Sequence, residues 1–223
     1  MHSIYRRRCR IFRRFALLLP ALAFLGVAGC ATNSLDSNLQ NNDADKITAL
    51  VRANPALVLH RDKHGDTLLH WAAARGQEPL ARLLLSDHAD INARDNHGDT
   101  PLHLAAGNGR GSVTELLLAD NAEVNAQDVF GDTPLHLAAK YGYAKEAEEL
   151  LAHDADITAK DANGETPLHY AAMFGMKDVA EVLVNHGAEI NPEDNDGMTP
   201  LHLAILNSHG NIAVLLSQNG GHE

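Results

Sequence analysis

The chain has 223 residues, and its 18 Lys and Arg stand against 29 Asp and Glu, which gives a formal net charge of −11 at pH 7. The length allows one or two domains, and a hydrophobic fraction of 45% is ordinary for a folded globular chain. An acidic chain lacks the basic footprint that phosphate binding needs. Composition therefore excludes nucleic acid as an expected partner.

Residues 1–29 have the outline of a secretory signal peptide. Six arginines lie within the first fourteen positions, and an apolar run over residues 15–28 follows them. This run is shorter than the roughly 20 residues that a transmembrane helix needs. It ends in Val27, Ala28, Gly29 and Cys30, a pattern that resembles the lipobox of bacterial lipoproteins.

The lipobox resemblance implies that Cys30 carries lipid, that the signal is removed before it, and that residues 30–33 form a lipidated tether. An uncleaved anchor, or a chance cysteine after an apolar run, is the alternative. Cleavage would remove six Arg and no acid, so the net charge would become 12 − 29 = −17. Cys9 would leave with the leader, so no thiol would remain for a disulfide. Ala31 stands where enteric inner-membrane lipoproteins usually have Asp, so we expect the outer membrane, facing the periplasm, with the inner membrane as the alternative.

Residues 34–61 are predicted to form a degenerate amino-terminal capping repeat. Carrying back the 33-residue period of the downstream chain places Ser34 where each later repeat has Thr. Ile47, Leu50 and Val51 then have the i, i+3, i+4 spacing of a helix with one apolar face. Repeat arrays need such a terminal unit to cover an otherwise exposed face.

Five copies of one phrase organise the rest of the chain. Thr-Pro-Leu-His begins at Thr100, Thr133, Thr166 and Thr199, and Thr67-Leu68-Leu69-His70 is an imperfect copy. The spacing is 33 residues without insertion or deletion, and an Asp-x-x-Gly turn opens each copy. The period gives repeats over 62–94, 95–127, 128–160, 161–193 and 194–223.

This period and phrase resemble the ankyrin repeat family. The resemblance implies an all-α ankyrin-repeat solenoid of helix-turn-helix units joined by β-hairpin-like loops, and a surface that binds protein. The local chemistry agrees, because Thr100 suits an N-cap and Pro101 suits the first helical position. A single unit buries too little apolar surface to fold alone, so neighbouring repeats must share a core.

The regular histidines of the phrase invite a metal or catalytic interpretation, which we reject. In the family this His is structural, and it bonds to backbone and to the Thr of the phrase. Copies one repeat apart are also too distant to share a metal, whose ligands each lie about 2 Å away. We therefore expect structural roles, no metal, no cofactor and no enzyme activity for these pairs: Thr67 and His70, Thr100 and His103, Thr133 and His136, Thr166 and His169, Thr199 and His202.

Aromatic and thioether side chains gather in the third and fourth repeats, at hairpin tips and on or just after first helices. Such residues are enriched at the centres of protein interfaces. The predicted partner-binding residues are Val129, Phe130, Tyr141, Tyr143, Tyr170, Met173 and Phe174. For Tyr170 and Met173 the alternative of filling the groove between repeats stays equally open.

The sequence thus predicts a monomeric scaffold of the bacterial cell envelope, anchored to a membrane by lipid, that binds a protein partner. The alternative is a periplasmic inhibitor or immunity protein that blocks an enzyme or toxin through the same surface. Both functions use hairpin tips and first helices, so only the effect on the partner separates them.

Overall fold

The computed structural model describes residues 35, 37–39 and 41–222. The predicted signal peptide, Cys30 and the tether lie outside these residues. The chain divides into two compact units, one ending at Leu57 and the other beginning at Val58.

The first unit contains helix α3 (Ala44–Ala53), preceded by helical residues at 35 and 37–39. The carboxylate of Asp43 accepts the Lys46 amide at 3.1 Å and so caps the helix start. Ile47 and Val51 are buried, as the predicted stripe requires, whereas Leu50 is only half-buried. A short 3₁₀ helix, η2 (Pro55–Leu59), follows. That this segment caps the repeats stays a prediction.

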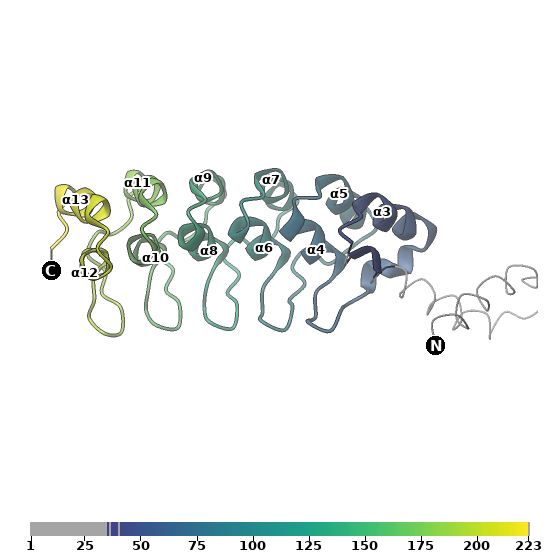
Figure 1. Cartoon of the computed structure of the whole chain (residues 1–223), viewed down its shortest axis with the longest axis horizontal. Helices are drawn as coiled ribbons and strands as arrows, with labels where there is room; N and C mark the ends of the chain where they lie inside the picture. Colours follow the sequence, from purple (N-terminus) through teal and green to yellow (C-terminus); the bar gives the residue numbers. More distant parts are fainter. Residues whose placement is uncertain (1–34, 36, 40, 223) are drawn as a thin grey trace, which may run out of the picture. The chain divides into compact units, whose positions relative to one another are not determined.

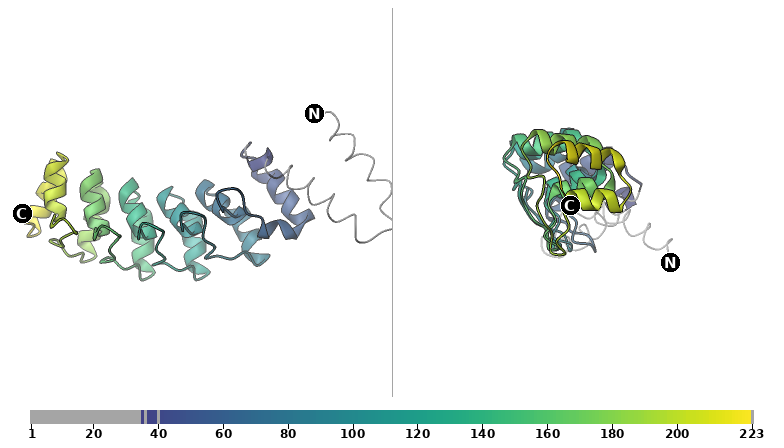
Figure 2. Two further views of the ribbon diagram at one scale, coloured as in Figure 1. Left: turned by 90° about the horizontal axis from the view of Figure 1, so that it is seen from below. Right: turned by 90° about the vertical axis from the view of Figure 1, so that its left-hand side faces the viewer.

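The second unit is built from five helix pairs. They are α4 (Leu68–Arg75) and α5 (Glu78–Ser86), α6 (Pro101–Gly107) and α7 (Gly111–Ala119), α8 (Pro134–Tyr141) and α9 (Ala144–Ala152), α10 (Pro167–Phe174) and α11 (Lys177–Asn185), α12 (Pro200–Leu206) and α13 (Gly210–Gln218). The first members of the pairs, which we call the inner helices, form one layer, and the second members, the outer helices, form another (Figure 1, Figure 2). Loops project from the inner layer toward one side. The described residues contain no strand, so the predicted all-α repeat solenoid is confirmed.

The core lies between the two layers of the second unit. In the second repeat, Leu102 from α6 and Leu117 from α7 are fully buried, and both recur in the neighbouring repeats. Burying one such side chain contributes about 1.5 to 3 kcal/mol. Ala105 and Ala106 are also fully buried, and their small size lets adjacent inner helices approach closely.

Local chemistry sets the helix ends. A Thr caps the start of every inner helix of the second unit, and in four of them Pro takes the first helical position. The turns after the outer helices need a left-handed residue, which Gly187 supplies with φ +84°. Three earlier turns use His88, Asn121 and Asp154 there, at φ between 63° and 64°.

Candidate functional site

The Thr–His pairs join each repeat to the next. The Thr133 amide donates to His136 Nδ1 at 3.1 Å, and His136 Nε2 lies 3.1 Å from the Glu165 carbonyl. Because a carbonyl can only accept, Nε2 carries the proton and Nδ1 the lone pair. The same bonds, to the carbonyl 29 residues later, are made by His70, His103 and His169. Both ring nitrogens of these four histidines are thus occupied, which leaves none to ligate a metal.

Burial keeps three of these imidazoles neutral. Loss of solvent lowers the pKa of His103 to about 4 and lowers the pKa values of His136 and His169. Among the described residues, no group of three His, Cys, Asp or Glu side chains is arranged to hold a metal ion. His202 makes the Thr199 contacts at longer distances, 3.1 Å to the hydroxyl and 3.4 Å to the amide.

The hairpin tip of the third repeat is held rigidly. The Asp128 carboxylate accepts the amides of Phe130 and Asp132 at 2.8 and 2.9 Å. The tip is also tied to its neighbours, because the Val129 amide donates to the His97 carbonyl at 2.9 Å and the Phe130 carbonyl accepts an amide of the next tip at 2.9 Å. The side chains of Val129 and Phe130 remain 63% and 61% exposed.

Two more of the predicted rings lie at the carboxyl ends of inner helices. Tyr141 ends α8 and is 53% exposed, and Phe174 ends α10 and is 39% exposed. The Lys140 ammonium lies 5.8 Å from the centroid of each of these rings. This distance allows cation–π attraction, which helps to hold the rings of adjacent repeats in place.

Tyr143 and Met173 are half-buried. The Tyr143 ring covers the backbone of Gly109, where an added Cβ would lie 2.5 Å from a ring carbon. These two side chains therefore present less free surface than Phe130 and Tyr141.

Tyr170 does not belong to the exposed surface, which favours the alternative that it fills the groove between repeats, and its binding of a partner stays a prediction. Its side chain is 6% exposed, and its hydroxyl lies 2.6 Å from Asp132 Oδ1 and 3.1 Å from Asp161 Oδ2. The ring meets the edge of His136 with 5.2 Å between centroids. Burial, followed by these carboxylates, raises the pKa of the hydroxyl above its ordinary value. Tyr170 fills the space between repeats, which was the alternative interpretation.

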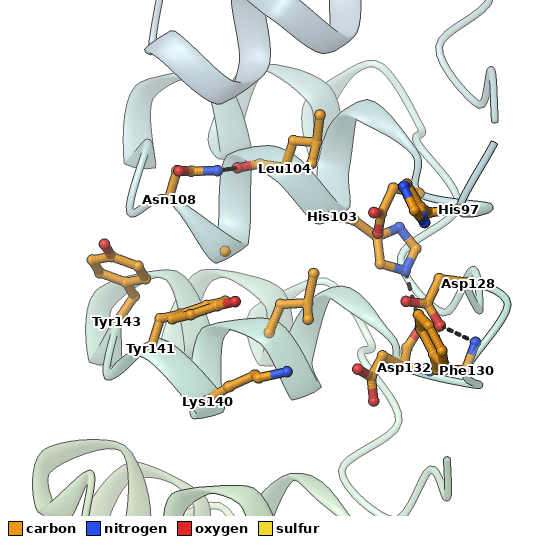
Figure 3. A pocket seen from close by; sticks show the side chains of 13 residues that line it. His97, His103, Leu104, Asn108, Asp128, Phe130, Asp132, Lys140, Tyr141 and Tyr143 are labelled. Carbon is orange, nitrogen blue, oxygen red and sulfur yellow. Dashed lines mark hydrogen bonds between the residues drawn. The ribbon is translucent and has the colours of Figure 1, made fainter. Parts of the chain in front are cut away.

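A groove of about 550 Å³ lies between the second and third repeats. Figure 3 shows Tyr141, Tyr143 and Asn108 toward one end of it, and His97, Phe130 and Asp128 toward the other. Residues from both inner helices and both hairpins line it: His97, Asp99, His103, Leu104, Gly107, Asn108, Asp128, Phe130, Asp132, Leu137, Lys140, Tyr141 and Tyr143.

The acidic residues of this groove were missed by the sequence reasoning. Burial, with Asp95 and Asp128 nearby, raises the pKa of Asp99 to about 6. Burial also raises the pKa of Asp132. A signal existed, because the residue before each Thr of the phrase is acidic in four of the five repeats: Asp66, Asp99, Asp132 and Glu165.

A family model described as "Ankyrin repeats (3 copies)" matches the chain in overlapping segments over residues 37–128, 96–161, 113–194 and 135–223. Together these segments cover well over half of the sequence. A search of curated proteins found no significant match.

Proposed function

The chain belongs to the ankyrin repeat family, and from this premise we propose that it is a protein-binding scaffold held by lipid at a membrane of the bacterial cell envelope. The observation that carries the binding role is the pair of exposed rings Phe130 and Tyr141 on a rigid framework. Exposed apolar clusters on a folded protein commonly mark interaction sites. The scaffold holds these rings in a fixed arrangement before binding, so only the partner loses conformational freedom when the complex forms.

The envelope location rests on the first thirty residues. The basic segment, the apolar run and Val27-Ala28-Gly29-Cys30 support export and lipidation of Cys30. Two or more acyl chains make a stable anchor, at about 0.8 kcal/mol for each buried methylene. Among the described residues no helix has the length and apolar character to cross a bilayer. Ala31 favours the outer membrane, where the repeats would face the periplasm.

Binding is tested by capture from envelope extracts followed by reconstitution with the purified partner. Wild type should retain a protein that the double variant Phe130→Ala, Tyr141→Ala does not retain. Arg75→Ala is a matched control, because Arg75 is exposed and occupies the Tyr141 position of the first repeat. Equal retention by the wild type and the double variant would contradict the proposed surface. An assay of the partner's own activity then separates a scaffold from an inhibitor.

Anchoring is tested separately with Cys30→Ser. The variant should lose incorporation of labelled fatty acid and leave the membrane fraction or accumulate as an uncut precursor. Unchanged labelling and fractionation would overturn the lipid anchor. Density fractionation of wild type distinguishes the two membranes, and migration with inner-membrane markers would refute the outer-membrane assignment.

A further inference from the structure

The groove between α6 and α8 has an apolar floor. Leu104 and Leu137 line it with Gly107. Gly107 is the last residue of α6, and a Cβ added there would lie 3.3 Å from the Leu137 Cβ and 3.7 Å from the Tyr141 ring. The same position carries Lys140 in the third repeat and Met173 in the fourth. The absence of a side chain at Gly107 therefore keeps the floor open beside the exposed Tyr141 ring.

The other end of the groove is acidic, and among the described residues its carboxylates form no ion pair within 4.0 Å. Asp99 is the central residue, because its Oδ1 is buried and receives no hydrogen bond. Asp128 and Asp132 line the same groove, and both add to the negative potential at Asp99. A half-buried carboxylate without a partner is unfavourable, and a cation that enters the groove would relieve this cost.

The one lysine of the groove does not supply that cation. Lys140 lies over the rings of Tyr141, Tyr170 and Phe174, with its ammonium 5.8 Å from each centroid. The ion pairs seen within 4.0 Å among the described residues join other side chains. Three carboxylates thus face one lysine in a chain of net charge −11.

We propose that this groove takes an arginine side chain of the partner protein, carried on an extended segment whose neighbouring apolar side chain packs on Leu104, Leu137 and Tyr141. The inference rests on the proposed protein-binding function and names the chemistry of the partner. A guanidinium pairs with the Asp99 carboxylate through directed hydrogen bonds and packs its planar face on the Phe130 ring. A lysine ammonium forms no such planar contact, and it is more strongly hydrated.

Charge and shape favour this occupant over other classes of ligand. A nucleic acid would bring phosphates against the three carboxylates. A bare metal ion would leave the apolar floor and the exposed Tyr141 ring uncovered. An arginine beside an apolar residue matches both ends of the groove at once, and the groove connects with the exposed rings of the proposed partner surface.

The experiment selects peptides from a random library displayed on phage against the full wild-type chain. We expect the enriched peptides to share an arginine next to an apolar residue. One such peptide is then compared with its citrulline analogue, which keeps the shape and loses the charge. Binding by fluorescence anisotropy should weaken about tenfold or more with citrulline, since hydrogen bonds between charged groups are the strong ones.

Asp99→Asn supplies the protein side of the test, and Asp66→Asn is its matched control. Asp66 occupies the same position one repeat earlier, its Oδ1 is also buried without a hydrogen bond, and it does not line the groove. Asp99→Asn should weaken the arginine peptide about tenfold or more and leave the citrulline peptide almost unchanged. Asp66→Asn should bind both peptides as wild type does. Removing the charge should not unfold the chain, because the buried Oδ1 of each of these carboxylates accepts no hydrogen bond.

The outcomes separate the inference from the proposed function. If enriched peptides lack arginine, or if Asp99→Asn binds the arginine peptide as tightly as wild type, the inference is overturned while protein binding stands. If free arginine amide competes as well as the peptide, the site takes a small molecule and the partner assignment is wrong. If wild type binds neither peptides nor an envelope protein, the proposed function fails and the inference fails with it.

Discussion

The Tyr170 hydroxyl donates a hydrogen bond to Asp132 Oδ1 at 2.6 Å, across 38 residues of sequence. Asp132 is 4% exposed, and the same hydroxyl lies 3.1 Å from Asp161 Oδ2. One donor is therefore placed between two carboxylates that belong to the openings of the third and fourth repeats. This contact ties adjacent hairpins together on the side of the inner helices.

Tyr170→Phe should destabilise the protein by about 1 to 3 kcal/mol, because it leaves the buried Asp132 carboxylate without its donor. The hydrogen bond holds the pKa of Asp132 below the value that burial alone would give. The loss of stability should therefore be larger in the pH range where this carboxylate is ionised, and smaller in acid. Urea unfolding of wild type and variant, at neutral pH and in acid, measures this loss of stability. Tyr143→Phe, at a half-buried position, is the control with little expected change, and a pH-independent loss would contradict the assignment.

The buried histidines make the protein less stable as the pH falls, whereas a buried acid makes it less stable as the pH rises. An unfolded histidine has a pKa of about 6.5, whereas burial lowers the pKa of His103 to about 4. Below the unfolded value the unfolded chain binds the proton more readily, so stability is lost as the pH falls through this window.

His136→Ala should lower the free energy of unfolding by about 1 to 3 kcal/mol near neutral pH, because Thr133 and the Glu165 carbonyl lose their partner. Burial lowers the pKa of His136, so its contribution falls below about pH 6.5 and the difference from wild type should shrink there. Denaturant unfolding across the acid range tests this. His64→Ala removes an exposed tip histidine and should change little, and a difference that grows in acid would refute the neutral imidazole.

Asp99→Asn should stabilise the protein. Its folded pKa is raised to about 6 by burial, above the unfolded value of about 3.9. Below the unfolded pKa, Asp99 is protonated in both states and does not destabilise the fold. As the pH rises through the folded pKa, the buried group must ionise and the wild type loses stability. Allowing for screening of this partly exposed group, the gain near neutral pH should be about 1 kcal/mol, and it should vanish near pH 4. Asp120→Asn, at an exposed position, is the control. A loss of stability near neutral pH would show that Asp99 has a compensating partner.

The period of the sequence was sufficient to predict the helix pairs, and it placed Thr133 and His136 at the start of a helix. These features are local, because a cap and its helix lie within a few residues of one another. The burial of Tyr170 could not be predicted in this way. The equivalent Leu104 and Leu137 are half-buried, whereas the equivalent Leu203 is 7% exposed, so burial at this position depends on the neighbouring repeats and not on the period.

The groove also could not be predicted from the sequence, because the residues that line it come from two repeats. Gly107 leaves space only in relation to Leu137 and Tyr141 of the next repeat. Burial is the main cause of the raised pKa of Asp99, and Asp128, which comes from the following hairpin, adds to it. These contacts between residues of two repeats depend on how neighbouring repeats pack. The repeated phrase contains only the residues that all repeats share, so it cannot predict them.

Left-handed turns after the outer helices give a test of backbone strain. His88 is exposed and has φ 63°, which costs a residue with a side chain about 1 to 2 kcal/mol. His88→Gly should relieve this strain and stabilise by about 0.5 to 1 kcal/mol after the greater freedom of glycine in the unfolded chain is counted. Gly187→Ala is the converse control, because φ is +84° and no atom lies within 4 Å of the new Cβ. It should destabilise by about 1 kcal/mol through the backbone alone. Thermal melts measure both variants, and melting temperatures that shift in the same direction for both would contradict the strain argument.

Phe130 and Tyr141 should be the anchors of the partner site. Central anchors of interfaces cost about 2 kcal/mol or more when truncated, so the double variant Phe130→Ala, Tyr141→Ala should weaken partner binding at least about thirtyfold. Both side chains are more than half exposed, so each truncation should change stability by only about 0.5 kcal/mol. Tyr170→Ala gives the contrast, because loss of a buried aromatic costs about 3 to 5 kcal/mol. Affinity by titration calorimetry and melting by circular dichroism on the same variants decide the matter. Intact binding by the double variant, or a melting temperature lowered as far as in Tyr170→Ala, would place the partner site elsewhere.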